Sequence, residues 1–494
     1  MRPHDKESDE ASVATDVLSQ NTFDAPICQA DGQPSSTQRF PFRSLEALRI
    51  KLLDLTARNT LLNFTFRKTN SIRLVDELPD QIASVLADGK LFTFFPVPEP
   101  LEEQLIEHGF IVYDKDDKLI RNDYPTAEEW AKILGIHTSH DLPPAEAAAE
   151  RHHHHNDTGL QTLLYPPELD ARLRGLRSKA ETSIEETGAN ILYLALGFLE
   201  WTEDDNSSRK YLAPLFTMPV ELKRSPTPDK NGVFYSTIGL KDDGLLTNIT
   251  LHEKIKQDFA LNVPFLQEEE TPERYFESLS NTLLHQKPRW RLRRQASLVL
   301  LNFAKQAMYE DLDPNNWPET NPLTEHPIIA HLFGSAELDG EVNGFSYAEE
   351  SAIDDIENVH TQFPIIYDAD SSQHSALIDA VNGDNLVIEG PPGSGKSQTI
   401  TNIISANIAN GKRVLFVAEK MAALNVVKDR LDRAGLGDFC LELHSHKTNK
   451  QKLLEALGLR INHGHYGPPQ GMSTDIERLE THQRKLSDYA ALIN

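Results

Sequence analysis

The sequence predicts an α/β protein of at least two domains, in which a mixed α+β region precedes a parallel sheet. Three observations support this prediction. The chain has 494 residues, whereas single hydrophobic cores stop growing at roughly 250 to 300 residues. Hydrophobic residues make up 39% of the chain and charged residues 25%, a composition typical of packed globular domains. After residue 384, short apolar runs alternate with helical stretches, which is typical of a parallel sheet.

The acidic charge belongs to the front of the chain. The net charge is -26, and residues 361–494 contain 14 Lys and Arg against 15 Asp and Glu, which leaves 35 against 60 on residues 1–360. Nucleic-acid binding relies on clustered positive charge. We therefore do not expect the front of the chain to be a general nucleic-acid platform.

Composition also limits the cellular setting. Cys28 and Cys440 are the two cysteines, and their wide separation favours neither a disulfide framework nor a Cys-based zinc site. The first ten residues are too polar for a secretory signal. No apolar run approaches the roughly 20 residues needed to cross a bilayer. We expect a cytoplasmic protein without a membrane partner.

Four regions follow one another along the chain. Residues 1–40 are polar and lack an apolar period, which predicts a disordered tail. A leucine-rich helical pattern, with Ser44 placed to cap it, opens an α+β domain at 41–334. This domain has an internal linker near 145–158. An acidic connector at 335–365 then leads into the last domain, 366–494.

Residues 390–397, Gly-Pro-Pro-Gly-Ser-Gly-Lys-Ser, form a phosphate-binding loop motif (P-loop). A β-type run at 385–389 precedes it and a helical stretch at 398–410 follows, as the motif requires. The glycines let backbone N–H groups face phosphate oxygens at the positive end of the helix. Lys396 is then expected to contact the β and γ phosphates, and the Ser397 hydroxyl to ligate Mg²⁺. An ordinary Gly-rich turn is the alternative interpretation.

The elements around this loop alternate regularly. The helix after the loop places Ile400 and Ile404 on one face and stops at Gly411, a residue typical of a left-handed cap. Further β-type runs occupy 414–418 and 439–443, and a helix is predicted between them at 421–434. Strand and helix in alternation predict a parallel sheet with right-handed crossovers.

Residues 390–399 resemble motif I of superfamily 1 helicases, and Gln373, 17 positions before the loop, resembles their adenine-reading glutamine. An amide side chain can pair with both N6 and N7 of adenine. A surface glutamine in the first helical turn after Ser371 or Ser372 is the alternative. The resemblance implies a RecA-like P-loop domain that binds ATP with Mg²⁺. The expected nucleotide contacts are Gln373, Gly390, Pro391, Pro392, Gly393, Ser394, Gly395, Lys396, Ser397 and Gln398, with Lys396 and Ser397 in catalytic roles.

Two further segments carry the expected DNA contacts. Residues 414–424 resemble motif Ia, the strand end and loop that touch single-stranded DNA in this family, which implies contacts from Glu419 and Lys420. These residues would lie at the carboxyl end of a parallel strand, where such sheets bind ligands. The segment with His444, Ser445 and Lys447 is similar to another backbone-contacting segment. An ordinary solvated loop is the alternative for both.

The front of the chain resembles a domain-of-unknown-function family. Residues 190–201, 213–222 and 308–317 carry this resemblance. The family precedes the helicase core in large bacterial proteins, some of which end in a Vsr-like endonuclease domain and are associated with defence against foreign DNA. The resemblance therefore implies single-stranded or duplex DNA and the remaining helicase domains as partners.

Two helicase features are absent from the sequence. No apolar strand ending in Asp-Glu follows Ser397, and no second domain with a catalytic arginine is present, although hydrolysis needs both. We expect a fragment, truncated before the second acidic motif. It is expected to bind ATP with Mg²⁺ without turning it over at a helicase-like rate. A nucleotide-sensing adaptor that recruits proteins without unwinding is the alternative function.

Three weaker patterns also suggest functions. The imidazoles of 152–155 could bind zinc or nickel, with a solvated loop as the alternative. Glu221 and Lys223 have the spacing of metal-dependent nucleases, with charges at a strand edge as the alternative. The segment from Trp290 to Arg294 could stack on and pair with nucleic acid, with a solvated face as the alternative.

Overall fold

The structure is a computed structural model of the chain. It describes residues 39–75, 77–116, 118–142, 158–204, 207–225, 235–241, 244–267, 270–318, 348–350, 352–443 and 471–493, and isolated residues within 320–329 and 454–461. Residues 1–38 of the predicted tail, most of the linker near 145–158 and the connector before residue 348 lie outside the described residues.

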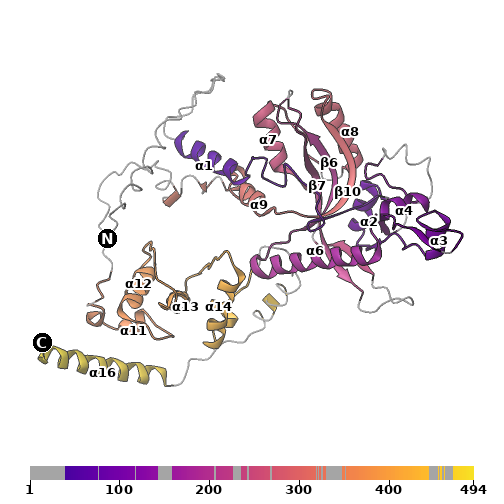
Figure 1. Ribbon diagram of the computed structural model, residues 1–494. Coiled ribbons are helices and arrows are strands. Elements are labelled where there is room, and N and C mark those ends of the chain that lie inside the picture. Colours follow the sequence, from indigo (N-terminus) through magenta and orange to yellow (C-terminus); the bar gives the residue numbers. More distant parts are fainter. Residues whose placement is uncertain are drawn as a thin grey trace, which may run out of the picture.

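An eight-stranded sheet dominates the first part of the chain (Figure 1). The strand order is β1, β10, β6, β7, β8, β2 and β5, and β9 pairs with β7. All neighbours are antiparallel except β2 and β5. The bounds are β1 (Ser71–Arg73), β2 (Phe92–Phe95), β5 (Gly159–Gln161), β6 (Leu192–Trp201), β7 (Tyr211–Arg224), β8 (Ser236–Leu240), β9 (Leu246–Thr247) and β10 (Arg291–Leu300).

The two ends of this sheet meet. Leu74, directly after β1, forms an antiparallel bridge with Thr162, directly after β5. The backbone N–H of Val75 donates to the carbonyl of Gln161 over 3.2 Å. The sheet therefore curls until β1 and β5 protect each other's edge, and exposed edges are the part of a sheet most prone to unwanted pairing.

The main hydrophobic core lies between the sheet and four helices: α2 (Pro79–Ala87), α6 (Pro166–Thr187), α7 (Ile249–Phe259) and α8 (Pro272–Leu279). A second cluster around Phe64 and Phe198 covers β6 and β10 from the other side. This explains why β6 is apolar along nearly its whole length. Gly197 in β6 has a φ of +80°, and a Cβ there would lie 2.5 Å from Phe276 Cζ, so only glycine fits.

A smaller unit extends from this sheet. It consists of α3 (Glu102–Glu107), α4 (Ala127–Ile133) and the two-stranded sheet of β3 (Ile111–Tyr113) and β4 (Leu119–Asn122). The buried ring of Trp130 on α4 centres its core. Together with the main sheet, this unit confirms a mixed α and β composition for the front of the chain.

The first helix differs from the prediction. α1 (Arg39–Leu52) begins before Ser44, so Ser44 does not cap it. The Asn59 side-chain amide donates to the carbonyls of Leu53 (2.7 Å) and Asp54 (3.0 Å). These bonds hold a turn that competes with helix continuation, and Asp54 has a φ of +49°.

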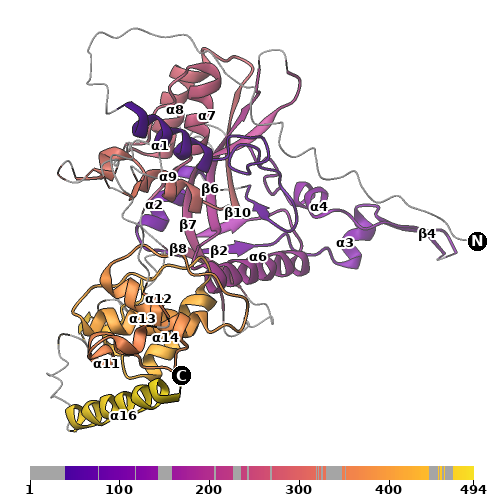
Figure 2. The same ribbon diagram turned by 90° about the vertical axis from the view of Figure 1, so that its left-hand side faces the viewer.

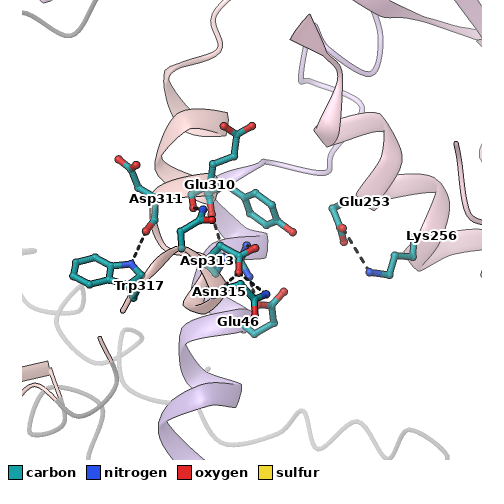
Figure 3. A network of polar contacts seen from close by, with 11 residues as sticks. Glu46, Glu253, Lys256, Glu310, Asp311, Asp313, Asn315 and Trp317 are labelled. Atoms are coloured by element: carbon teal, nitrogen blue, oxygen red, sulfur yellow. Dashed lines mark hydrogen bonds and ion pairs between the residues drawn. The ribbon is translucent and has the colours of Figure 1, made fainter. Parts of the chain in front are cut away.

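Figure 3 shows Glu46 of α1 beside Asp313, which follows α9 (Ala304–Asp311). Arg49 bonds both of these carboxylates and so attaches α1 to α9 and the turn after it. Its Nε donates to the carbonyl of Tyr309 (3.1 Å), and its terminal nitrogens lie 2.6 Å from Glu46 and 2.8 Å from Asp313. The guanidinium carbon lies 4.4 Å from the centroid of the Tyr309 ring. Arg49 is only 5% exposed, so this network holds a charge that burial alone would disfavour.

Helices form the described framework of the second part of the chain: α11 (Val359–Gln362), α12 (Ser371–Asn382), α13 (Lys396–Ala409), α14 (Met421–Arg433) and α16 (Met472–Ile493). Leu377 and Ile378 on α12 pack with Ala406 on α13, while Ile404 packs with Val427 and Leu431 on α14. α13 and α14 agree with the helices predicted at 398–410 and 421–434.

The predicted parallel sheet is not formed within residues 352–443. The segments 385–389, 414–418 and 439–443 have no strand pairing among the described residues. Val387, Leu415 and Val417 are 90%, 80% and 76% exposed. The β-branched and apolar residues of these segments favour a strand conformation. Strand propensity alone does not determine which segment would pair with them, and no such pairing forms within the part of the chain that the structure describes. The RecA-like arrangement is therefore not confirmed.

α6 lies between the sheet and the C-terminal helices in both views (Figures 1 and 2). It contacts α14, so the two parts of the chain meet at these helices. Within the described residues, no helix is long and apolar enough to span a membrane.

Candidate nucleotide-binding site

The loop of residues 390–397 leads directly into α13. Gly393 and Gly395 have φ values of +89° and +80°, which side-chain-bearing residues rarely adopt. Gly395 is the N-cap of α13, and its carbonyl accepts bonds from the backbone N–H groups of Gln398 (2.8 Å) and Thr399 (2.9 Å). The loop thus turns sharply onto a helix N-terminus, where unpaired N–H groups and the helix dipole favour an anion.

Lys396 is the first residue of α13 and remains exposed. Its Nζ donates to the carbonyl of Gly390 and to that of Pro391 at 3.2 Å. The ammonium group therefore lies over the mouth of the loop. The hydroxyl of Thr401 donates to the carbonyl of Ser397 over 2.6 Å, which fixes the backbone that carries the expected Mg²⁺ ligand.

Gln373 lies against this loop although it precedes it by 17 positions. Its Nε2 donates to the carbonyl of Ser394 over 3.1 Å. A Cβ on Gly395 would lie 2.6 Å from this Nε2, so the amide packs directly on the glycine. The structure therefore brings the expected base-reading residue and the expected phosphate loop together.

The start of α12 sets the position of Gln373. Asp370, rather than Ser371 or Ser372, is the N-cap of this helix, and its Oδ1 accepts the backbone N–H of Gln373 over 2.8 Å. This backbone bond lowers the pKa of the Asp370 carboxyl below its ordinary value. The sequence contains the signal, since Asp370 and Gln373 have the spacing of a capping box.

Two side chains of α13 hold the segment before α12. Asn402 is 1% exposed and bonds the backbone of Ile366 and Tyr367. Gln398, an expected nucleotide contact, donates from Nε2 to the carbonyl of Asp368. Sequence reasoning missed Asn402, because its partners lie about 35 positions earlier and no local pattern encodes such a contact.

The expected DNA contacts are only partly described. Glu419 and Lys420 are exposed, and Lys420 is the N-cap of α14. They follow an unpaired segment rather than a parallel strand. His444, Ser445 and Lys447 lie outside the described residues.

The weaker patterns gain no functional support. Trp290 is buried and donates to the Thr202 hydroxyl over 3.2 Å, so its ring cannot stack on a base. Arg293 pairs with Glu200 and Asp141, and Arg294 with Glu273.

The Lys223 ammonium lies 2.9 Å from Glu221, so the two side chains neutralise each other at the surface. Among the described residues, no group of three or more His, Cys, Asp or Glu side chains is placed to hold a metal ion. Residues 152–155 lie outside the described part of the chain.

Two segments of the chain match known protein families. Residues 51–255 match a family described as a protein of unknown function (DUF4011). Residues 368–484 match a family described as an AAA domain, and this match contains Gln373, the loop, α13 and α14. No solved structure matches the chain.

Two relatives carry a functional name. The chain is 28% identical over 303 residues to an uncharacterized ATP-dependent helicase, MG140, of Mycoplasma genitalium, a match that covers 55% of this chain and 25% of the relative. It is 53% identical over 62 residues to the homologue of that protein in Mycoplasma pneumoniae, covering 13% of this chain and 6% of the relative. The chain therefore contains a segment similar to the AAA domain family, preceded by a segment similar to the DUF4011 family. It spans about a quarter of the first relative's length.

Proposed function

We propose that this chain is the ATP-binding N-terminal part of a superfamily 1 DNA helicase or translocase that acts in nucleic-acid processing or in defence against foreign DNA. The observation that carries the proposal is the direct bond between Gln373 and the P-loop at Ser394. A base-recognition residue and a phosphate loop in contact fit a purine nucleoside triphosphate better than a free anion.

The side chains fit this ligand. The helix N-terminus and the ammonium of Lys396 provide positive charge for the β and γ phosphates. Mg²⁺ keeps several waters and binds phosphate oxygens together with few protein groups. Ser397 lies in the first turn of α13, and its hydroxyl would be the ligand that this chain supplies to Mg²⁺. Gln373 can accept from N6 and donate to N7 of adenine.

DNA binding and unwinding belong to the proposal for the whole protein. The name of the Mycoplasma relative supports ATP-dependent helicase activity. Lys420 and Glu419 lie exposed at the start of α14, within the AAA match. A lysine beside a helix N-terminus suits a DNA phosphate. A longer protein would supply the acidic motif and the arginine needed for hydrolysis.

The test is the salt dependence of single-stranded DNA binding by this chain, measured with a non-hydrolysable ATP analogue. We expect Lys420→Ala to weaken DNA binding and to reduce the slope of log affinity against log salt by about one unit. Lys90→Ala, which removes one exposed lysine far from α14 in sequence, is the control and should leave the slope unchanged. If the chain binds ATP but does not bind single-stranded DNA at low or at high salt, the adaptor function is favoured instead.

A further inference from the structure

Asn402 binds a segment of backbone that is distant in sequence through both polar atoms of its side chain. It lies six residues after Lys396 on α13, a rise of about 9 Å along the helix. Its Oδ1 accepts the backbone N–H groups of Ile366 (3.2 Å) and Tyr367 (3.0 Å), and its Nδ2 donates to the carbonyl of Tyr367 (2.9 Å). These bonds reproduce the pairing that a neighbouring strand would offer to this segment.

A second asparagine on the same helix, Asn407, makes no comparable bond to another described segment. Asn407 is also buried, at 8% exposure, but its Nδ2 donates to the carbonyl of Ile403 within α13. Asparagine is unfavourable in a helix interior unless its side chain finds partners. Asn407 finds its partner on its own helix, whereas Asn402 connects α13 to another segment.

The segment that Asn402 holds leads to Gln373 within six residues. Asp370 in this segment caps α12 and bonds the backbone of Gln373. Between these points, Gln398 of α13 bonds the carbonyl of Asp368. The path from Asn402 to Gln373 is therefore attached at residues 366, 367 and 368 to α13 and at Asp370 to α12, and α13 begins with Lys396, the expected phosphate contact.

We propose that Asn402 is a positioning residue for adenine recognition. It fixes the segment 366–370 on α13, and it thereby sets the distance between the Gln373 amide and Lys396. The site can then bind a base and a triphosphate together only when the distance between them matches the distance between Gln373 and Lys396. This inference rests on the proposed nucleotide-binding function and adds a residue that does not itself touch the nucleotide.

The experiment measures the dissociation constants of ATP, GTP and inorganic tripolyphosphate for the full chain and for Asn402→Ala. Tripolyphosphate reports on the loop alone, because it carries no base. We expect Asn402→Ala to weaken ATP binding about tenfold, the effect of about one hydrogen bond to the base. Tripolyphosphate affinity should stay within about twofold. The preference for ATP over GTP should fall toward unity.

The matched control is Asn407→Ala, which removes a buried asparagine from the same helix without cutting a tie to the segment 366–370. It should keep the ATP preference of the wild type. Asn402→Ser is the milder variant, because it shortens the side chain without placing a charge in this buried position, and it should retain an intermediate preference. If Asn402→Ala fails to bind tripolyphosphate because the loop has lost its structure, the ratio measured for Asn402→Ser decides.

An unchanged ATP to GTP ratio in Asn402→Ala, with tripolyphosphate binding intact, would overturn this inference. So would an equal loss of the ratio in Asn407→Ala. Failure of the underlying function looks different, since it appears in the wild-type chain. No binding of any of the three ligands by the wild type would reject the nucleotide site, whereas triphosphate binding without base preference would reject Gln373 as the base reader.

Discussion

The side-chain amide of Gln373 donates a hydrogen bond to the backbone carbonyl of Ser394 over 3.1 Å. This bond joins the start of α12 to the P-loop and uses one of the two N–H groups of the amide, so a second N–H remains for adenine N7.

Gly395→Ala is expected to disrupt the contact between loop and amide. Gly395 has a φ of +80°, which strains any residue with a side chain. The added Cβ would also lie 2.6 Å from Gln373 Nε2. ATP affinity should fall at least about tenfold. The control is Gly411→Ala, which has a similar φ of +71° but open space around the added methyl group. Both variants carry backbone strain of about 1 to 2 kcal/mol, so equal ATP binding by the two would contradict the prediction.

Gln373→Ala should remove the preference for adenine and keep part of the triphosphate affinity. The loop and Lys396 remain, while the donor and acceptor for N7 and N6 are lost. Competition between ATP and GTP for a fluorescent nucleotide measures both effects. An equal loss of affinity for ATP and GTP would count against base reading by Gln373.

Asn248→Ala should destabilise the front of the chain by about 2 to 4 kcal/mol. Asn248 is the N-cap of α7 and is 1% exposed. Its Nδ2 also donates to the buried carbonyls of Leu61 (2.7 Å) and Pro214 (2.8 Å), which alanine would leave without this donor. The N-cap Thr271 of α8 makes only a 3.5 Å local bond, so Thr271→Ala should cost about 0.5 kcal/mol. Chemical denaturation compares the two variants, and equal losses would be evidence against the network.

Acidification should destabilise the front of the chain through His252. Burial lowers the pKa of His252 from 6.5 to about 4. Between these two pH values the unfolded chain binds a proton that the folded chain does not. The contribution of His252 is therefore complete above pH 6.5, and the free energy of unfolding falls as pH is lowered, by up to about 1.4 kcal/mol per pH unit.

Denaturation of His252→Gln and the wild type at pH 7.5, 6 and 5 tests this prediction. The difference in stability between the two proteins should shift in favour of the variant as pH falls. His285→Gln, which replaces an exposed histidine in the same part of the chain, is the control for the substitution itself. If the stability of His252→Gln depends on pH in the same way as that of the wild type, burial of the neutral His252 ring is contradicted.

The sequence predicts local features of the site well. The P-loop glycines and the helices α13 and α14 follow from motif and periodicity, whereas Gln373 is singled out only by its resemblance to the adenine-reading glutamine of superfamily 1 helicases. Each of these depends on residues that are near one another in sequence or on a spacing typical of the motif. The predicted sheet of the second part is different, because Val387 or Leu415 encodes a preference for a strand and not the identity of its neighbour.

Long-range polar ties are the other feature that sequence does not reveal. Asn402 meets Tyr367 across 35 positions, and Tyr367 in turn donates its hydroxyl to the carbonyl of Arg430 across 63 positions. Asparagine and tyrosine are common enough that neither stands out by type. Only the folded chain shows that both hold the segment that positions Gln373.

Nucleotide binding by residues 390–397 is tested by the affinity of this chain for ATP with Mg²⁺, determined by isothermal titration calorimetry for the wild type, Lys396→Ala and Lys412→Ala. Lys412 is a second lysine of the same part of the chain, and its Nζ bonds the carbonyl of Val381 at the end of α12. We expect ATP binding by the wild type and by Lys412→Ala, and a loss of about 10- to 100-fold for Lys396→Ala, the effect of removing a charged hydrogen-bond donor from the phosphates. Equal affinity of Lys396→Ala and the wild type would contradict the assignment of residues 390–397 as the nucleotide site.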